Sequence, residues 1–558
     1  MASEPLPLAP PFAEPAPERP VLVPGSGRVP APVLADKLAY KEVLFAALLA
    51  LVLTGALFFV QRRIDWNPSD EGFLWYGAVR TAHGGVPLRD FRSYDPGRYY
   101  WAAAWAQLLG DGILALRLST AVFQACGLFC GLLAARRTVK SRWGLALAGV
   151  LLLVWMSPRH KLFEPAMTMA AVLVGVRLLE RPSLRRCFGA GVLVGLAGIL
   201  GKNHGLYCAA AMLSLLLFVH FRIAPARLAP RELARRLLAW GVGVAAGFSP
   251  LLALLPVRGF FASYVESFRF FLLQGKTNYP EPFPWPWLEL RARLDSGGGR
   301  LDGIGRLELT AFGVILLLVP VFLVTAAVFM AGADRENLKR RALLIASGTV
   351  GLFYAHHMYS RTDFFHLTQS LHPILLGVIA LPAAVARRRL AVAWLVPALA
   401  AATLLTAVPQ MPLFHRLTAP PDAPFVPFNL AGDEIYLPAH QADVLTTVRW
   451  NLDSRVPKGE PILFAAHLPG YYPAFGRPSP VWDSYPMWPG IGGLDERMLA
   501  ELQAKNVRWA LIATYPMPGS EELRFQNSYP KVWDYLMENF DHVRTPGMPH
   551  RLRLFHRL

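Results

Sequence analysis

The sequence predicts a polytopic α-helical membrane protein with a small α/β domain at its C-terminus. Of its 558 residues, 54% are hydrophobic and 17% are charged, whereas soluble domains carry about 25% charged residues. Apolar stretches of about 20 residues, the length that crosses a bilayer as a helix, recur through the first three quarters of the chain. Hydropathy then drops and stays low to the C-terminus, which is why a water-soluble domain is expected there.

Residues 1–41 are rich in proline and alanine and contain no apolar run. Such a composition cannot bury a hydrophobic core, so we expect a disordered tail on the cytoplasmic side. No cleavable signal peptide is visible. The apolar stretch 43–60 is therefore expected to serve as a retained membrane anchor.

About eleven transmembrane helices are expected in the region 42–408. The stretches predicted to span the membrane are 43–60, 112–134, 143–157, 163–179, 188–201, 205–221, 237–256, 309–331, 341–357, 371–386 and 390–408. Two longer loops, 61–111 and 257–307, separate some of them. Within one stretch, the glycine-rich run 241–247 is interpreted as a surface for close helix packing.

Basic clusters set the predicted orientation. Arginine-rich clusters follow every even-numbered stretch, at 136–142, 177–186, 222–236, 335–341 and 387–389. Since cytoplasmic loops carry an excess of Lys and Arg, these loops and the N-terminus are placed in the cytoplasm. Arg62 and Arg63 follow the first stretch and favour the opposite orientation, but the later clusters outweigh them. Loops 61–111 and 257–307 and the domain 409–558 are therefore predicted on the non-cytoplasmic face.

The same distribution argues against nucleic-acid binding, although the net charge is +18. The arginine clusters recur at the ends of apolar stretches, as topology determinants do. High alanine, arginine and proline contents with few lysines indicate a GC-rich bacterial genome. We therefore expect a multi-pass protein of the bacterial inner (plasma) membrane, with its C-terminal domain periplasmic or otherwise extracytoplasmic.

The region 409–558 is predicted to be this soluble α/β domain, and roughly 140 residues are enough for one hydrophobic core. Stretches 461–466 and 507–515 are predicted as short buried strands, and 494–506 as the helix that precedes the second strand. Charged and apolar residues alternate over 551–558, which predicts an edge strand.

Two adjacent acids, Asp70 and Glu71, follow the first apolar stretch in the loop 61–111. Carboxylates at a membrane surface are costly unless they have partners or a task. One of them can act as a general base on an acceptor hydroxyl, while the other positions substrate or changes the proton affinity of the first. The alternative is structural: Ser69 caps a helix whose first turn holds both acids.

Further along this loop, Asp95-Pro96-Gly97 is predicted to be a turn, and Arg98 follows it. A guanidinium matches phosphate oxygens in a bidentate geometry, so Arg98 is a candidate for binding a donor phosphate. Asp95 is a candidate for binding an acceptor or a metal ion. In the alternative, the Arg98 side chain extends its charged end to the membrane–water interface, beside a belt of Tyr and Trp side chains.

Glu164 and Lys202 lie at the entrances to later apolar stretches. Glu164 is a candidate for binding an acceptor or a divalent ion, and the alternative is an acid that complements a helix dipole. Lys202 stands in an apolar setting, where an ammonium group requires an anion such as a polyprenyl phosphate. Its alternative is an ordinary turn between two helices.

The segment SRTDFFHL holds Arg361, Asp363 and His366. At a helix start, Asp363 and His366 share a face. Arg361 is a candidate for binding the donor phosphate, and His366 for stabilising a leaving phosphate. His356 and His357 lie nearby, but the spacings match no standard ligand pattern, so a divalent metal ion is left open.

The acidic pair Asp70–Glu71, the stretches 84–87 and 94–97 that follow it, and the expected topology resemble the GT-C superfamily of membrane glycosyltransferases. The resemblance is to its family 39-like group, which includes protein O-mannosyltransferases and the aminoarabinose transferase of lipid A. Glu164 matches a second acid of that family. Arg98 stands near a Lys-Pro-Pro-like element of the family, and the C-terminal region lacks the β-trefoil-like pattern of the eukaryotic O-mannosyltransferases.

The resemblance implies a glycosyltransferase that takes its sugar from a polyprenyl-phosphate donor. The acceptor would be an envelope glycolipid, polysaccharide or protein on the non-cytoplasmic face. It implies direct displacement with inversion, with Asp70 as the base and the donor phosphate held by Lys202, Arg98 or Arg361. The alternatives are a transporter or flippase of a lipid-linked or anionic solute, and an envelope scaffold in which the acids are structural.

Overall fold

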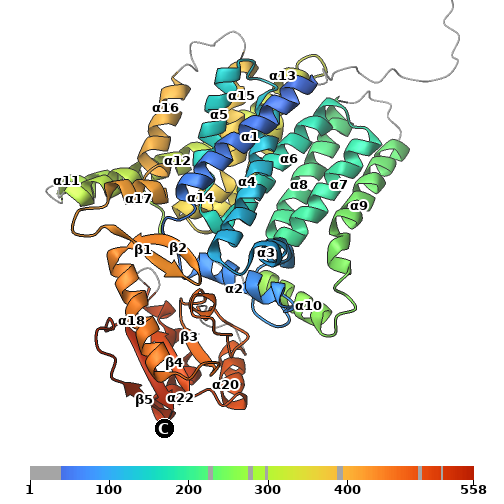
Figure 1. The fold of residues 1–558 in the computed structure, drawn as a ribbon. Helices are drawn as coiled ribbons and strands as arrows, with labels where there is room; N and C mark the ends of the chain where they lie inside the picture. The colour runs from blue at the N-terminus through green and yellow to red at the C-terminus, as the bar shows by residue number, and fades with distance from the viewer. Residues whose placement is uncertain are drawn as a thin grey trace, which may run out of the picture.

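The computed structural model describes residues 39–223, 230–273, 281–295, 300–385, 394–487, 493–516 and 520–557. A large helical part occupies the upper two thirds of Figure 1, and a smaller C-terminal part of strands and short helices lies below it. Most of the expected tail, 1–38, lies outside the described residues. The first helix begins at Tyr40, slightly before the predicted end of the tail.

One set of helices, most of them long, runs through the helical part (Figure 1). They are α1 (Tyr40–Gln61), α4 (Ile113–Ala135), α5 (Arg142–Val154), α6 (Phe163–Glu180), α7 (Leu184–Leu200), α8 (Lys202–Phe218), α9 (Pro230–Leu252), α12 (Arg300–Ala331), α13 (Leu338–Ser360), α15 (His372–Ala384) and α16 (Leu395–Ala402), the short member of this set. Shorter helices connect them: α2 (Asp70–Ala82), α3 (Pro96–Leu109), η1 (Arg159–Lys161), η2 (Val219–Ile223), α10 (Phe260–Leu273), α11 (Pro286–Asp295), α14 (Phe364–Ser370), η4 (Thr403–Ala407) and α17 (Pro412–Thr418).

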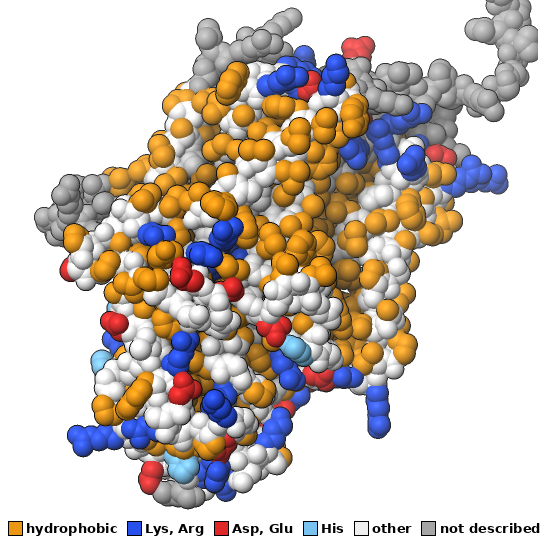
Figure 2. Space-filling view, viewed as in Figure 1, with side chains coloured by type: hydrophobic (Ala, Val, Ile, Leu, Met, Phe, Trp, Pro, Cys, Tyr) orange, Lys and Arg blue, Asp and Glu red, His pale blue; other side chains and the backbone are white. Residues whose placement is uncertain are grey.

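Within the described residues, four helices are long and apolar enough to cross a membrane, or up to six when each of two bent helix pairs counts as one span. The predicted count of eleven therefore stays a prediction. In Figure 2 hydrophobic side chains cover much of the visible face of the helical part, while Lys and Arg gather at its upper end. Charges of both signs mix over the C-terminal part, a distribution typical of a membrane protein with a water-exposed region.

The glycine-rich run 241–247 packs α9 closely against α7. A Cβ atom on Gly243 or Gly247 would lie 2.1 or 2.2 Å from the carbonyl oxygens of Phe188 and Val192 in α7. Only glycine permits this approach of two helix backbones. The interpretation of this run as a helix-packing surface is confirmed.

The long loop 257–307 is only partly a loop. The structure describes α10 and α11 within it, and α12 begins before its predicted end. The aromatic segment that joins α10 to α11 includes residues 274–280, which lie outside the described residues.

In the other loop, 61–111, the predicted turn at Asp95-Pro96-Gly97 is instead the start of α3. Asp95 stands at the N-cap and Pro96 is the first helical residue, because proline fits a position whose N–H has no helical partner.

The C-terminal part contains a hairpin and a four-stranded sheet. The antiparallel hairpin is β1 (Phe425–Leu430) and β2 (Asp433–Pro438). The sheet has the order β3-β4-β6-β5, with β3 (Ile462–Ala465) parallel to β4 (Trp509–Ala513) and antiparallel pairs elsewhere. Its remaining strands are β5 (Phe540–Val543) and β6 (Leu552–Arg557). The helices around the strands are α18 (Ala439–Arg455), α19 (Tyr471–Ala474), α20 (Leu494–Ala504), η5 (Glu521–Leu523), α21 (Phe525–Ser528) and α22 (Pro530–Asn539).

The strands predicted at 461–466 and 507–515 and the helix at 494–506 are confirmed as β3, β4 and α20. The prediction that 551–558 is an edge strand is wrong in one respect. It is a strand, β6, but it lies between β4 and β5. Leu552 and Leu554 are buried on one face of β6 and Phe555 on the other, because successive side chains of a strand point to opposite faces. Both faces are covered there, as expected of a strand inside a sheet.

The C-terminal part is joined closely to the loop that carries the acidic pair. The backbone N–H of Asp65 donates to the carbonyl oxygen of Tyr436 in β2 at 2.8 Å. Arg92 forms a 2.7 Å ion pair with the buried carboxylate of Asp483. These contacts hold residues far apart in sequence around one end of the helical part, which is where the candidate site lies.

Candidate active site between the helical and C-terminal parts

A cavity of about 550 Å³ lies where the helical part meets the C-terminal part. Its lining includes every site residue predicted from the sequence: Asp70, Glu71, Asp95, Arg98, Glu164, Lys202, Arg361 and His366. They come from α2, α3, α6, α8, α14 and the segments between helices. The structure therefore brings all of these candidates to a single site.

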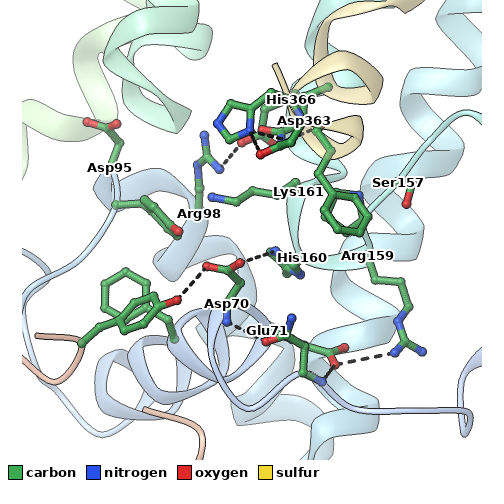
Figure 3. A pocket seen from close by; sticks show the side chains of 18 of the residues that line it. Asp70, Glu71, Asp95, Arg98, Ser157, Arg159, His160, Lys161, Asp363 and His366 are labelled. Carbon is green, nitrogen blue, oxygen red and sulfur yellow. Dashed lines mark hydrogen bonds and ion pairs between the residues drawn. The ribbon is translucent and has the colours of Figure 1, made fainter. Parts of the chain in front are cut away.

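Asp70 is the first residue of α2, and its carboxylate points into the cavity (Figure 3). The side chain of Asn67, rather than that of Ser69, accepts the N–H groups of Ser69 and Asp70, both at 2.9 Å. Ser69 stands at the N-cap with both acids in the first turn, as the structural alternative expects, but its hydroxyl donates to the carbonyl oxygen of His467 and does not cap the helix. Because its backbone is fixed in this way, Asp70 presents its carboxylate from a rigid helix start.

The Asp70 carboxylate has polar neighbours but no Lys or Arg partner among the described residues. The hydroxyl of Tyr485 donates to its Oδ1 at 3.4 Å, and Nε2 of His160 lies 3.9 Å from its Oδ2. Burial lowers the pKa of His160 to about 4, although Asp70 opposes this shift. The imidazole is therefore neutral near pH 7. The Asp70 side chain is 40% exposed, so it remains accessible from the cavity.

Glu71 is buried, and both of its oxygens are held by arginine. Arg117 of α4 donates from Nε to Oε1 at 2.8 Å and from Nη2 to Oε2 at 2.9 Å. Arg159 lies 3.7 Å away. Burial by itself would raise the pKa of Glu71, but the two guanidinium groups lower it to about 2. A carboxylate held in this way is a fixed anchor, so the geometry favours a positioning role for Glu71.

Arg98 and Glu164 form a buried ion pair beside the cavity. Arg98 also donates to the carbonyl oxygen of Leu200 at the end of α7. The second carboxylate oxygen of Glu164, Oε2, is buried and has no hydrogen-bond partner among the described residues. Nε2 of His204 lies 3.9 Å from the paired oxygen, Oε1. Arg98 therefore ties α3, α6 and the α7–α8 junction together.

Asp95 and Lys202 form a second pair. The ammonium group of Lys202 contacts Oδ1 of Asp95 at 2.5 Å, and the backbone N–H of Lys202 donates to Oδ2 at 3.1 Å. The carboxylate thereby caps the N-terminus of α8. Lys202 is the first residue of α8 and follows the break at Gly201 between α7 and α8.

Arg361, Asp363 and His366 form a third group. Asp363 caps α14 by accepting the N–H of His366 at 2.7 Å, and its oxygens lie 3.0 Å from the Nδ1 of His366. The predicted shared face of Asp363 and His366 is confirmed. Nε of Arg361 lies 2.6 Å from Asp363, and its Nη2 lies 3.3 Å from Glu281.

Lys161 was not among the predicted site residues, although it lines the same cavity. Its Nζ atom lies 3.7 Å from the centre of the Tyr94 ring. Within the described part of the chain its ammonium group has neither a hydrogen bond nor an ion pair. Burial lowers the pKa of Lys161 to about 8, with Glu164 opposing the shift and Arg98 reinforcing it. The sequence signal was its place three residues before Glu164 in a cationic loop.

The sequence also missed Arg117 and Tyr485, because each lies far along the chain from the acid it contacts. Arg117 sits inside a predicted membrane stretch, and Tyr485 belongs to the C-terminal part. Among the residues that the structure describes, no group of three or more His, Cys, Asp or Glu side chains is placed to hold a metal ion. The cavity acids mostly face cations instead.

Part of the cavity lining is apolar. It includes Leu57, Leu153, Val154, Met156, Met411 and Pro412, and the polar residues Gln61, Gln410 and His415 come from the same segments. Charged residues such as Asp70, Arg98 and Lys161 also line the cavity (Figure 3). The site can therefore hold a molecule with an apolar chain and a charged head.

No protein-family model matches the chain, and no curated protein matches it in sequence. A solved structure of ArnT from Cupriavidus metallidurans bound to undecaprenyl phosphate matches with a TM-score of 0.52 and 14% identity, over 92% of this chain and 98% of that chain. The chain has the GT-C fold. This confirms, at the level of the fold, the resemblance predicted from the acidic pair and the topology.

Two further solved structures match this chain over most of its length. ArnT from Cupriavidus metallidurans in the apo state has a TM-score of 0.42 and 15% identity, over 92% of this chain and 97% of that one. The oligosaccharyltransferase AglB from Archaeoglobus fulgidus was solved in complex with an inhibitory peptide and a dolichol-phosphate. It has a TM-score of 0.42 and 12% identity, over 93% of this chain and 74% of that chain.

Proposed function

We propose that this GT-C chain transfers a sugar from a polyprenyl-phosphate donor to a hydroxyl group of an envelope acceptor, on the non-cytoplasmic face of a bacterial inner membrane. The acceptor class is a glycolipid, a polysaccharide or a protein. The orientation follows from the basic clusters of the sequence. The proposal keeps 42–408 as the transmembrane unit and 409–558 as the extracytoplasmic one.

The observation that carries the proposal is the state of Asp70. Of the four acids predicted as site residues, Glu71, Asp95 and Glu164 are each paired with an arginine or a lysine. Asp70 alone among these four has no such pair, and it is also the one that is accessible from the cavity. A general base needs both properties, because a paired, buried carboxylate neither reaches a hydroxyl nor accepts its proton readily.

The proposed step is an inverting displacement at the anomeric carbon. Asp70 takes the proton of the acceptor hydroxyl as the acceptor oxygen forms a bond to that carbon. The bond from the anomeric carbon to the phosphate oxygen breaks, and its electron pair leaves with the polyprenyl phosphate. Glu71 holds the start of α2 through Arg117, so that the base stays in place.

The apolar part of the cavity lining supports a lipid-linked donor. An isoprenoid chain is favourably buried against apolar side chains, while its phosphate is attracted by the charged side chains of the lining. A protein of the same fold, ArnT from Cupriavidus metallidurans, has been solved bound to undecaprenyl phosphate. The sequence predictions that Lys202, Arg98, Arg361 and His366 contact the donor phosphate remain predictions, since each is described without ligand and with protein partners of its own.

The test compares envelope glycans and glycolipids by mass spectrometry in the source organism. The strains are wild type, a deletion, Asp70→Asn and Glu266→Gln, with the variants at matched protein levels. Glu266 is an exposed acid of α10 at the edge of the same cavity. We expect the deletion and Asp70→Asn to lose the same sugar, since removal of a general base costs about 100- to 10,000-fold in rate.

The control decides whether the effect belongs to Asp70. Glu266→Gln is expected to keep the sugar, and its loss there would point to a general effect of cavity charge. If only the deletion changes the envelope, Asp70 is not the base. A transporter or flippase of a lipid-linked or anionic solute would then be the better assignment.

A further inference from the structure

We infer that Lys161 is the cation that receives the phosphate of the departing polyprenyl phosphate, a role that rests on the proposed function and extends it to a residue the sequence did not indicate. The inference starts from the place of the side chain. Lys161 projects from the end of η1 into the cavity, and in Figure 3 its ammonium end extends into the space between Asp70 and Arg98. It therefore faces the same space as the proposed base.

Charge balance requires a cation beside the leaving phosphate. A polyprenyl-phosphate sugar is a phosphodiester with one negative charge, and the polyprenyl phosphate that leaves is a monoester that gains a second one. That charge develops as the bond to the sugar breaks, so a preplaced cation stabilises the transition state more than the bound donor. In an inverting displacement the leaving phosphate lies across the sugar from the base, and so does the required cation.

Each of the arginines and the other lysine around the cavity already has a carboxylate nearby. Arg92 is paired with Asp483, and Arg159 lies 3.7 Å from Glu71. Arg98 is paired with Glu164, and Lys202 with Asp95. Arg361 is held between Asp363 and Glu281. A phosphate that recruited any of these would have to compete with its neighbouring carboxylate.

Lys161 has no such competitor. Among the described residues its ammonium group contacts only the face of the Tyr94 ring, 3.7 Å from Nζ. A cation–π contact is weaker than a charge-assisted hydrogen bond to phosphate. Tyr94 can therefore hold the ammonium group and release it toward a phosphate, without an ion pair having to break.

The same placement predicts how donor binding depends on pH. Lys161 faces Glu164 of α6, Arg98 of α3, Asp70 of α2 and the Tyr94 ring, and His160 precedes it on its own element. The pKa of Lys161 is about 8. A bound phosphate favours the ammonium form, so above about pH 7, where the phosphate monoester carries its second charge, affinity falls as the pH rises through and above about 8.

The experiment measures binding of undecaprenyl phosphate to the full-length protein in detergent micelles, from about pH 7 to 9.5, a range in which the phosphate keeps its charge. Tryptophan fluorescence reports the affinity, and thermal unfolding reports whether each variant is folded. We expect Lys161→Met to weaken binding at pH 7 at least tenfold and to remove the pH dependence. Lys161→Arg should bind within about threefold of wild type at pH 7 and stay level up to pH 9.5, because a guanidinium does not titrate there.

Lys458→Met serves as the matched control, since Lys458 is exposed in the C-terminal part and its loss should leave affinity and pH profile unchanged. Wild-type affinity combined with an unchanged pH profile in Lys161→Met would overturn the role of Lys161 and leave the proposed function standing. Failure of the wild type to bind undecaprenyl phosphate would overturn both.

Discussion

The hydroxyl of Tyr485 donates a hydrogen bond to Oδ1 of Asp70 at 3.4 Å, across 415 positions of sequence. Tyr485 belongs to the C-terminal part and Asp70 to the first helix after α1. The C-terminal part therefore contributes a side chain to the cavity, and it does so at the proposed base. It is part of the site rather than an appendage to the helical part.

Tyr485→Phe is expected to lower kcat about fivefold with little change in KM. The hydrogen bond is expected to act by orienting the Asp70 carboxylate toward the acceptor, and the loss of that orientation is taken to cost about 1 kcal/mol. In an Asp70→Asn background the same substitution should cost much less, because the two residues act together. Transfer kinetics of the two single variants and the double variant measure this coupling. Tyr535→Phe is the control, since the Tyr535 hydroxyl has no hydrogen-bond partner in the described residues. Additive losses would show that Tyr485 does not act through Asp70.

Glu71→Gln is expected to destabilise the protein by about 3–5 kcal/mol at neutral pH, because it leaves the buried Arg117 and Arg159 without their counter-charge. The folded-state pKa of Glu71, about 2, lies below its ordinary value of 4.5. The ionised carboxylate therefore contributes about 3 kcal/mol above pH 4.5, and this contribution is lost as the pH falls toward 2. Thermal unfolding should show a difference in melting temperature between wild type and variant that is smaller at pH 3 than at pH 7.

Glu434→Gln gives the comparison for an exposed pair. Glu434 lies 3.5 Å from Arg63, and both side chains are about half exposed. Such a pair contributes under about 1 kcal/mol, so its loss should hardly change the melting temperature. If Glu71→Gln melted like Glu434→Gln, Glu71 would not be the anchor described above.

Gly72→Ala is expected to disturb the contact between α2 and the C-terminal part. A Cβ atom on Gly72 would lie 2.5 Å from the Cα atom of Gly470, so the two backbones would have to separate. Such overpacking costs about 1–3 kcal/mol, and it would also move Tyr485 away from Asp70. Thermal unfolding and transfer rate should both fall. Gly55→Ala, where a new Cβ would meet nothing within 4 Å, should change neither; equal behaviour of the two variants would contradict the close contact.

Asp95→Asn and Asp95→Ala separate two roles of one carboxylate. Asparagine retains an oxygen for the first N–H of α8 but removes the charge that Lys202 contacts. Alanine removes both, so its melting temperature should be lower by the loss of a cap, about 1 kcal/mol. Identical melting temperatures for the two variants would show that the bond from Asp95 to the α8 backbone contributes nothing.

Several features of this molecule were determined by the sequence alone. Long apolar stretches and the basic clusters require a helical membrane part, since a helix satisfies its own backbone hydrogen bonds in a bilayer. The strands β3 and β4 followed from short apolar runs. All eight predicted site residues were found at one cavity, because polar groups that interrupt apolar stretches are costly and are retained mainly where they have partners or a task.

Only the tertiary structure decided which of these residues are engaged and which are accessible. Sequence spacing gives no information on contacts such as Glu71 with Arg117 or Asp70 with Tyr485, which depend on how distant segments pack. It could not show that Lys202 is neutralised by Asp95 while Lys161 rests on an aromatic ring. Composition decides that a charge is present near a membrane surface, whereas the three-dimensional arrangement of its neighbours decides whether that charge is already compensated.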